Sequence, residues 1–374
     1  SGMLKTGNEF GETGFMLERI YKAVQKKHEL LNFQALWSGF HAFPFILYDG
    51  NRAYGRNGYF PQPEAFRGNT ALHYNGEWTA IWELAPAEMP DINVLSADLA
   101  HEMFHAFQME HKERRFPDDL AALAYPMDAG NLTAKLMENR MLAAAFATPD
   151  VSEKLRLLTR FVEIRGARAA ALKECFVFEL LPETAEGMAE YIGAQALAQL
   201  SMEAYIQRTE FFVDALTRIS PSLLDMRRQS YFSGALLLLT AHAAGIDFIH
   251  EIGTAVQPVY RLIEEALGLQ RFSEYTLPAP DPALVRLTEE EMLRRRSCIA
   301  YIQTRARVRT EGAFAICGYD PMNMWRQGQW LYGKNFWILR EKESGRICTL
   351  TGPSLLRCEA GMICAYYTDV EDWK

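Results

Sequence analysis

Between positions 91 and 296, hydrophobic residues recur at steps of three and four residues along most of the segment. This spacing places them on one side of an α-helix, so the region is predicted to be almost entirely helical. Proline, glycine and aspartate interrupt the pattern and separate successive helices. The expected helices cover residues 94–111, 132–147, 151–178, 184–206 and 223–244.

The two ends of the chain follow a different pattern. An amphipathic helix is expected at 15–31, followed by a strand at 43–48 and a hairpin centred on Asn75 and Gly76, a pair that suits a type I′ turn. After residue 297, short alternating segments separated by glycines predict strands, at 299–308, 313–317, 330–340 and 346–350.

The patterns together predict an α+β fold in three parts. Residues 1–90 form an N-terminal part with a helix and a sheet, residues 91–296 form the helical part, and residues 297–374 form a small β-rich domain. A chain of 374 residues with 49% hydrophobic residues can bury a large core.

Composition excludes several classes of partner. The formal net charge is −8, which argues against nucleic acid as a partner. No apolar run reaches the length needed to span a membrane, and no secretion signal is evident. The six cysteines form no C-x-x-C pair, so a cysteine-ligated metal is not expected. Reduced thiols in a cytoplasmic protein are the simplest account, although the pattern leaves open a disulfide or two among the five cysteines after residue 297.

The helix expected at 94–111 carries the motif H-E-x-x-H, formed by His101, Glu102 and His105. Two histidines four residues apart lie on the same face of a helix, about one turn from each other, so both imidazoles can reach one metal ion. The glutamate beside the first histidine then lies next to the open coordination position of the metal, where a water molecule would bind.

A third ligand is expected in the segment E-G-M-A-E-Y, which begins at Glu186 and ends at Tyr191. This segment belongs to the helix expected at 184–206. A glycine within a helix costs about 1 kcal/mol relative to alanine, so Gly187 needs a structural reason. We expect a close approach of this backbone to the helix that carries His101 and His105, which would bring Glu186 to the metal.

The two segments together resemble the gluzincins, a group of zinc metallopeptidases in the zincin superfamily. The resemblance covers residues 95–111 and 183–193 and implies a zincin-like catalytic region, with Zn²⁺ bound by His101, His105 and Glu186 and with Glu102 as the general base. It also makes Glu190 a carboxylate that orients one of the ligand histidines. The family usually has aspartate at that position, so the partner of the longer Glu190 side chain is left open.

Further expectations concern the substrate. Tyr231 lies in a Tyr-x-x-Gly context that resembles the aminopeptidase branch of the family, and it is the candidate for stabilising an oxyanion, with His242 and Tyr191 as alternatives. The strand after Gly76 leads towards the motif helix and is expected either to be the sheet edge that binds an extended peptide or to be an ordinary strand. The G-x-M-E-N segment of the aminopeptidase branch is missing, which leaves endopeptidase and exopeptidase activity open.

The expected function is that of a zinc-dependent metallopeptidase that hydrolyses a peptide or protein substrate. Three alternatives remain: a zinc-binding protein without turnover that serves as a binding or regulatory module, a helical binding protein in which the motif is accidental, and hydrolysis of a substrate other than a peptide. Sequence alone does not specify the oligomeric state.

Overall fold

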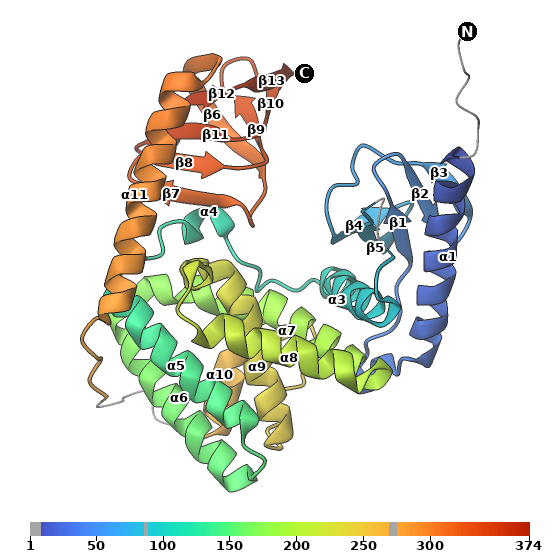
Figure 1. Cartoon of the computed structure of the whole chain (residues 1–374), viewed down its shortest axis with the longest axis vertical. Helices are drawn as coiled ribbons and strands as arrows, with labels where there is room; N and C mark the ends of the chain where they lie inside the picture. The colour runs from blue at the N-terminus through green and yellow to red at the C-terminus, as the bar shows by residue number, and fades with distance from the viewer. Residues whose placement is uncertain (1–8, 86–88, 269–274) are drawn as a thin grey trace.

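The computed structural model describes residues 9–85, 89–268 and 275–374. It has a mixed α+β fold in which a helical part joins two separate β-sheets, and both sheets lie on the same side of that part (Figure 1). The helices, including two 3₁₀ segments, are α1 (Glu9–Leu30), α2 (Phe33–Leu36), α3 (Ile92–Glu110), α4 (Asp119–Ala122), α5 (Ala129–Ala147), α6 (Val151–Leu172), η1 (Lys173–Phe176), α7 (Val177–Leu200), α8 (Met202–Thr217), η2 (Pro221–Leu224), α9 (Met226–Ala243), α10 (Val259–Ala266) and α11 (Pro282–Arg305).

The N-terminal sheet has the strand order β3-β2-β1-β5-β4. Its strands are β1 (Phe45–Tyr48), β2 (Arg52–Gly55), β3 (Gly58–Pro61), β4 (Thr70–Tyr74) and β5 (Glu77–Glu83). Successive residues of β1 face opposite sides of the sheet: Phe45 and Leu47 pack towards α1 and α3, whereas Ile46 and Tyr48 belong to a smaller cluster on the other side. Both faces of this strand are therefore buried.

The expected hairpin is present, with Asn75 and Gly76 at φ values of 49° and 87° between β4 and β5. Positive φ at both positions is what a type I′ turn requires. The strand after Gly76 is not the sheet edge, however, because β5 lies between β1 and β4. The two edge strands are β3 and β4, and of these β4 pairs antiparallel with β5 and contacts α3.

The helical part is held together at its centre by the crossing of α7 and α9. A Cβ atom added to Gly187 would lie 2.7 Å from Cα of Gly234, so only two glycines allow this approach. The expectation that Gly187 faces the motif helix was therefore wrong. The glycine that faces α3 is Gly193, where an added Cβ would lie 3.5 Å from the carbonyl oxygen of Ala97 and 3.7 Å from Cβ of His101.

A network of buried charges links α5, α6 and α7. Arg165 donates two hydrogen bonds to Glu183 at 2.7 and 2.8 Å, and Arg168 binds Glu138 at 2.8 and 2.9 Å. The network contains three carboxylates and three cationic groups, all buried: Glu138, Glu179, Glu183, Lys135, Arg165 and Arg168. Because the charges balance, the network fixes the three helices relative to one another with little uncompensated charge.

The C-terminal part is an eight-stranded antiparallel sheet in the order β13-β10-β9-β6-β12-β11-β8-β7, flanked by α11 (Figure 1). Its strands are β6 (Val308–Tyr319), β7 (Met324–Gln327), β8 (Trp330–Gly333), β9 (Phe336–Glu341), β10 (Ile347–Thr351), β11 (Ser354–Glu359), β12 (Met362–Thr368) and β13 (Val370–Trp373).

The strand expected at 299–308 was wrong, because these residues mostly belong to α11, which continues to Arg305 before β6 begins at Val308. Ile299 and Ile302 lie one turn apart on the helix and pack against Leu355 of the sheet. The change from helix to sheet therefore occurs between residues 305 and 308.

The described ranges also bear on membrane-spanning helices and on the cysteines. No helix there is both long and apolar enough to cross a membrane. All six cysteines are free thiols, so the chain forms no internal disulfide between them.

The buried network gives the first prediction. Burial raises the pKa of Glu138, but the charges of Arg165, Arg168 and Lys135 outweigh this effect and lower it to about 2. This value lies below that of an unfolded glutamate, about 4.3, so the contribution of Glu138 to stability is complete above about pH 4.3 and is lost as the pH falls towards 2. We expect Glu138→Gln to reduce the free energy of unfolding at pH 7 by about 3 kcal/mol, because it leaves buried guanidinium groups without their counter-charge.

Urea denaturation between pH 3 and pH 7 measures this effect. Glu163→Gln is the matched control, because Glu163 forms an exposed pair with Arg160 on α6 and should change stability by less than about 0.5 kcal/mol. Equal stability of Glu138→Gln and the wild-type chain at pH 7 would contradict the role given to the network.

Candidate metal centre

Helix α3 places the two histidines of the motif. It begins after Asp91, whose side chain accepts hydrogen bonds from the backbone amides of Asn93 and Val94. His101 and His105 follow in the middle of the helix, and their Nε2 atoms are 3.1 Å apart. Both side chains are largely buried, with exposed fractions of 11% and 15%. The histidines thus point to the same small space, as the four-residue spacing predicts.

Glu186 reaches this space from α7. Its Oε2 atom lies 3.0 Å from Nε2 of His105 and 3.7 Å from Nε2 of His101. Two ligand atoms on a tetrahedral zinc ion, each about 2.0–2.1 Å from the metal, lie roughly 3.3–3.4 Å from each other. The three side chains therefore form a triangle of the size that one such ion requires.

Glu102 lies beside the histidines and is itself buried. One of its carboxylate oxygens lies within 4.8 Å of a nitrogen atom of each histidine, and His101, Glu102 and His105 form a group that can hold a metal ion. Glu186 also lies beside both imidazoles, with Oε2 3.0 Å from Nε2 of His105 and 3.7 Å from Nε2 of His101. Glu102 and Glu186 are thus the two carboxylates that lie beside the imidazole pair.

Glu190 lies one helical turn beyond Glu186, and its Oε1 atom is 3.5 Å from Nδ1 of His101. The partner of this glutamate, which the sequence left open, is therefore His101. Arg208 of α8 also contacts Glu190: its Nη1 atom lies 3.8 Å from Oε2 of Glu190, and its Nη2 atom donates a hydrogen bond to Asp98 at 2.7 Å. These contacts direct Nε2 of His101 towards the triangle.

Gln108 orients the second histidine and was not identified from the sequence. Its Oε1 atom lies 2.8 Å from Nδ1 of His105, and its Nε2 donates to the carbonyl oxygen of Ala185 at 3.0 Å. A proton on Nδ1 of His105 donates to Gln108 and leaves the Nε2 lone pair free for a metal. The signal was present, since Gln108 follows His105 by three residues and so lies on the same face of the helix.

Arg227 and Asp119 were also missed, and no local pattern could have revealed them. Arg227, at the start of α9, donates to Oε1 of Glu186 at 3.1 Å and forms an ion pair with Asp119 of α4. The two oxygens of Glu186 are therefore divided: Oε1 faces Arg227 and Oε2 faces the histidines. This arrangement fixes the carboxylate in a single orientation.

Tyr231 lies next to this carboxylate. Arg227 stacks over its ring at 5.5 Å, and burial together with the negative charge of Glu186 raises the pKa of the phenol well above its usual value. A phenol that keeps its proton can donate a hydrogen bond to a developing oxyanion.

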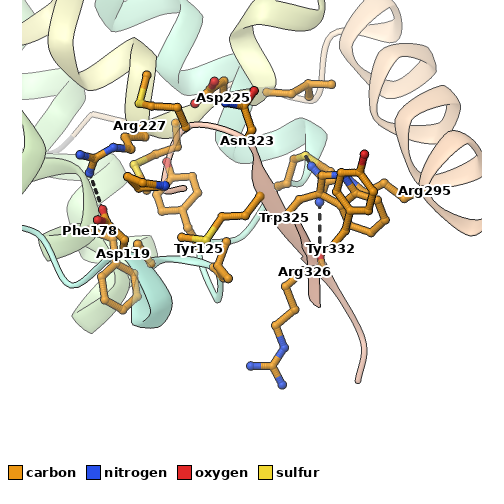
Figure 2. A pocket seen from close by; sticks show the side chains of 18 of the residues that line it. Asp119, Tyr125, Phe178, Asp225, Arg227, Arg295, Asn323, Trp325, Arg326 and Tyr332 are labelled. Carbon is orange, nitrogen blue, oxygen red and sulfur yellow. Dashed lines mark hydrogen bonds and ion pairs between the residues drawn. The ribbon is translucent and has the colours of Figure 1, made fainter. Parts of the chain in front are cut away.

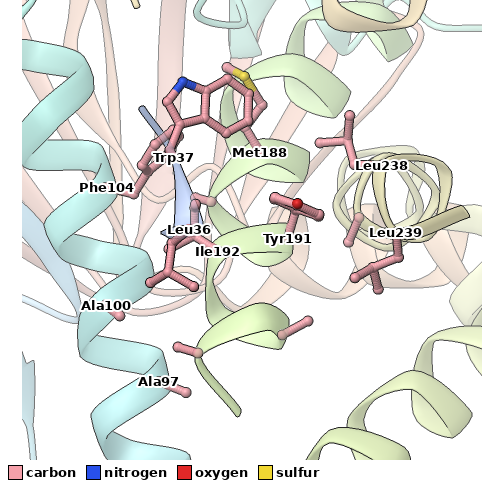
Figure 3. Packing of buried hydrophobic residues seen from close by; sticks show 14 of the residues in the cluster. Leu36, Trp37, Ala97, Ala100, Phe104, Met188, Tyr191, Ile192, Leu238 and Leu239 are labelled. Atoms are coloured by element: carbon pink, nitrogen blue, oxygen red, sulfur yellow. The ribbon is translucent and has the colours of Figure 1, made fainter. Parts of the chain in front are cut away.

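The two alternatives to Tyr231 do not lie at the site. Tyr191 extends from α7 towards Leu238 and Leu239, away from α3 (Figure 3). Its hydroxyl group is 3.3 Å from Nδ1 of His242, which is exposed to solvent. Both residues therefore belong to the region between α7 and the end of α9.

The charges of the site shift its titrating groups in a consistent way. Burial lowers the pKa of His101, but the hydrogen bond with Glu186 and the charges of Glu190 and Glu102 outweigh this effect and raise it to about 9. Burial raises the pKa of Glu186, but His105 and His101 lower it well below its usual value. Glu102 has no such dominant partner, and burial raises its pKa.

Comparison of the chain with known protein families, with curated proteins and with solved structures found no match. The interpretation of the site therefore depends on the motif and on the geometry of its side chains.

The outer contacts give the second prediction. Gln108→Leu removes the acceptor for His105 Nδ1 at nearly unchanged volume, so we expect metal affinity to fall by about 10- to 100-fold. Competition titration with a zinc-binding dye measures the change. Gln108→Glu keeps an acceptor oxygen and should recover most of the affinity, while Gln207→Leu, on the exposed face of α8, should have no effect. Unchanged affinity in a folded Gln108→Leu protein would show that His105 does not bind the metal through the oriented Nε2 atom.

Proposed function

We propose that this chain is a zinc-dependent metallopeptidase with a zincin-like catalytic region. The observation that carries the proposal is the convergence of His101, His105 and Glu186, from two helices, on a triangle with sides of 3.0 to 3.7 Å. Two further features support it: each ligand histidine has its own outer partner, and Glu102 lies directly beside the triangle. A site that only stabilises the fold has no use for this extra carboxylate.

The donor set favours zinc. Two imidazoles and one carboxylate are the protein ligands of many catalytic zinc sites, where a water molecule or the substrate takes the open position. Zinc bound here would lower the pKa of a water molecule to about 7 and polarise a substrate carbonyl.

The residues of the chain would then share the remaining work. Glu102 would accept a proton from the attacking water and return it to the departing amine. Tyr231 would donate a hydrogen bond to the oxygen of the attacked carbonyl, where negative charge develops. Glu190 and Gln108 would keep both imidazoles in the tautomer that presents Nε2, and Arg227 would hold Glu186 in place.

The edge strand β4 provides a place for an extended substrate. It is free on the side away from β5 within the described sheet and lies against α3, which carries the histidines. A peptide added to such an edge gains backbone hydrogen bonds whatever its sequence, which aligns its carbonyl groups along the strand. We infer that β4, and not β5, is the strand along which the substrate lies.

The third prediction concerns metal content. We expect about one zinc per chain in the purified wild-type protein and much less in Glu186→Ala, because two histidines alone hold the ion weakly. Elemental analysis after dialysis measures both. Glu203→Ala removes an exposed glutamate of α8 and should leave the zinc content unchanged. Absence of zinc from the wild type, even after the metal is added back, would refute the proposal.

The fourth prediction separates binding from turnover. Glu102→Gln should keep its zinc but lose peptidase activity by about 10²- to 10⁴-fold, because the amide cannot accept the proton. Cleavage of a mixed peptide library, followed by mass spectrometry, gives the readout. Glu110→Gln, an exposed position at the end of the same helix, should cleave like the wild type. A zinc-loaded wild type that cleaves no peptide would instead favour a binding or regulatory protein.

A further inference from the structure

A cavity of about 610 Å³ lies between the helical part and the C-terminal sheet. Its wall is formed by the segment around α4, the start of α9, α11, and the strands β7 and β8 with the turn before them (Figure 2). Cavities of this size commonly hold a ligand. The function proposed above uses none of the residues contributed by the C-terminal sheet.

The cavity adjoins the candidate metal centre. Arg227 lines it and also donates to the ligand carboxylate of Glu186 at 3.1 Å. Met322, in the turn before β7, lines the cavity and lies 3.6 Å from the hydroxyl oxygen of Tyr231 through its Sδ atom. The Arg227 side chain therefore connects the cavity to Glu186, and the Met322 side chain connects it to Tyr231.

The far end of the cavity is aromatic. Trp325 and Tyr332 stack with their ring centres 4.8 Å apart, and the guanidinium group of Arg295 lies 5.1 Å from the centre of the Trp325 ring (Figure 2). Methionine side chains line much of the remaining wall, and their flexibility allows a wall to adapt to side chains of different shape. They are Met127, Met226, Met322 and Met324.

The charge of the lining is opposite to that of the chain. Five cationic and three acidic side chains line the cavity, which gives +2, whereas the whole chain carries −8. Glu291 is shared by Arg294 and Arg295, so one positive charge in that group is not neutralised. Arg326 and Lys334 belong to the lining but are exposed, and they form no ion pair with any residue that the structure describes. The excess positive charge thus lies on the side of α11 and the sheet.

We propose that this cavity binds an acidic segment of the peptide substrate, with a large apolar side chain inserted between Trp325 and the methionines and with neighbouring carboxylates facing Arg326 and Lys334. This inference rests on the proposed function, since it identifies the substrate class of the same site. Charge complementarity commits the occupant to an acidic peptide. The C-terminal sheet is then a wall of the substrate site and selects which peptides reach the metal.

Binding to the inactive, zinc-loaded Glu102→Gln protein tests the proposal without requiring turnover. The probes are two short fluorescein-labelled peptides, each with one phenylalanine, flanked by glutamates in the first and by lysines in the second. Fluorescence anisotropy should show at least about ten-fold tighter binding of the acidic peptide, and this preference should weaken as salt is added. Equal affinity for both peptides, or binding of neither, would overturn the proposal.

Variants then locate the binding. Introducing Arg326→Glu and Lys334→Glu together should weaken binding of the acidic peptide by about ten-fold or more, and Trp325→Ala should weaken both peptides. The control is Arg340→Glu, an exposed charge reversal on β9, which is four strands away from β8 in the same sheet. Thermal melts establish that each variant is folded. Unchanged binding in the double variant would overturn the assignment of the cavity.

The outcome is separate from that of the peptidase proposal. If the acidic peptide binds as described but the wild type cleaves nothing, the peptidase function fails and the cavity assignment stands. If the wild type cleaves peptides but neither charge reversal nor Trp325→Ala changes which peptides it selects, the cavity assignment fails alone.

Discussion

The packing of α7 against α3 concentrates negative charge in a confined space, and the neighbouring cationic groups of the site offset that charge. Glu102, Glu186 and Glu190 all lie near the two histidines and are shielded from solvent. Carboxylates in such a place require nearby positive charge. Arg227 and Arg208 supply part of it. Protons on the imidazoles supply more, since the hydrogen bond with Glu186 and the charges of Glu190 and Glu102 raise the pKa of His101. A bound dication would take over that role.

The part of the site that the sequence predicted is the part that depends on local geometry. His101 and His105 could be assigned because a four-residue step has the same meaning in every α-helix. Glu186 was chosen from a family resemblance; its Oε2 atom lies 3.0 Å from Nε2 of His105, and its role as a ligand stays a prediction. Arg227 and Arg208 could not be predicted, because their contacts with Glu186 and Glu190 arise only when α9 and α8 pack against α7.

The same distinction applies to the fold. The Asn75–Gly76 turn and the helix over the motif are encoded by a few adjacent residues, and both are present. Residues 299–308 were assigned to a strand from their short alternating pattern, but the helix that begins at Pro282 continues to Arg305 and packs on the sheet. Gly187 correctly indicated a close helix contact, but the identity of the partner, Gly234, is a property of the tertiary structure.

The central claim is that one zinc ion is bound by three specific side chains, and a crystal structure of the zinc-loaded protein with anomalous diffraction at the zinc edge tests it most directly. The account predicts a single strong anomalous peak about 2.0–2.2 Å from Nε2 of His101, Nε2 of His105 and a carboxylate oxygen of Glu186. A peak at another location, or a zinc ion bound by the two histidines while Glu186 remains with Arg227 alone, would contradict the account.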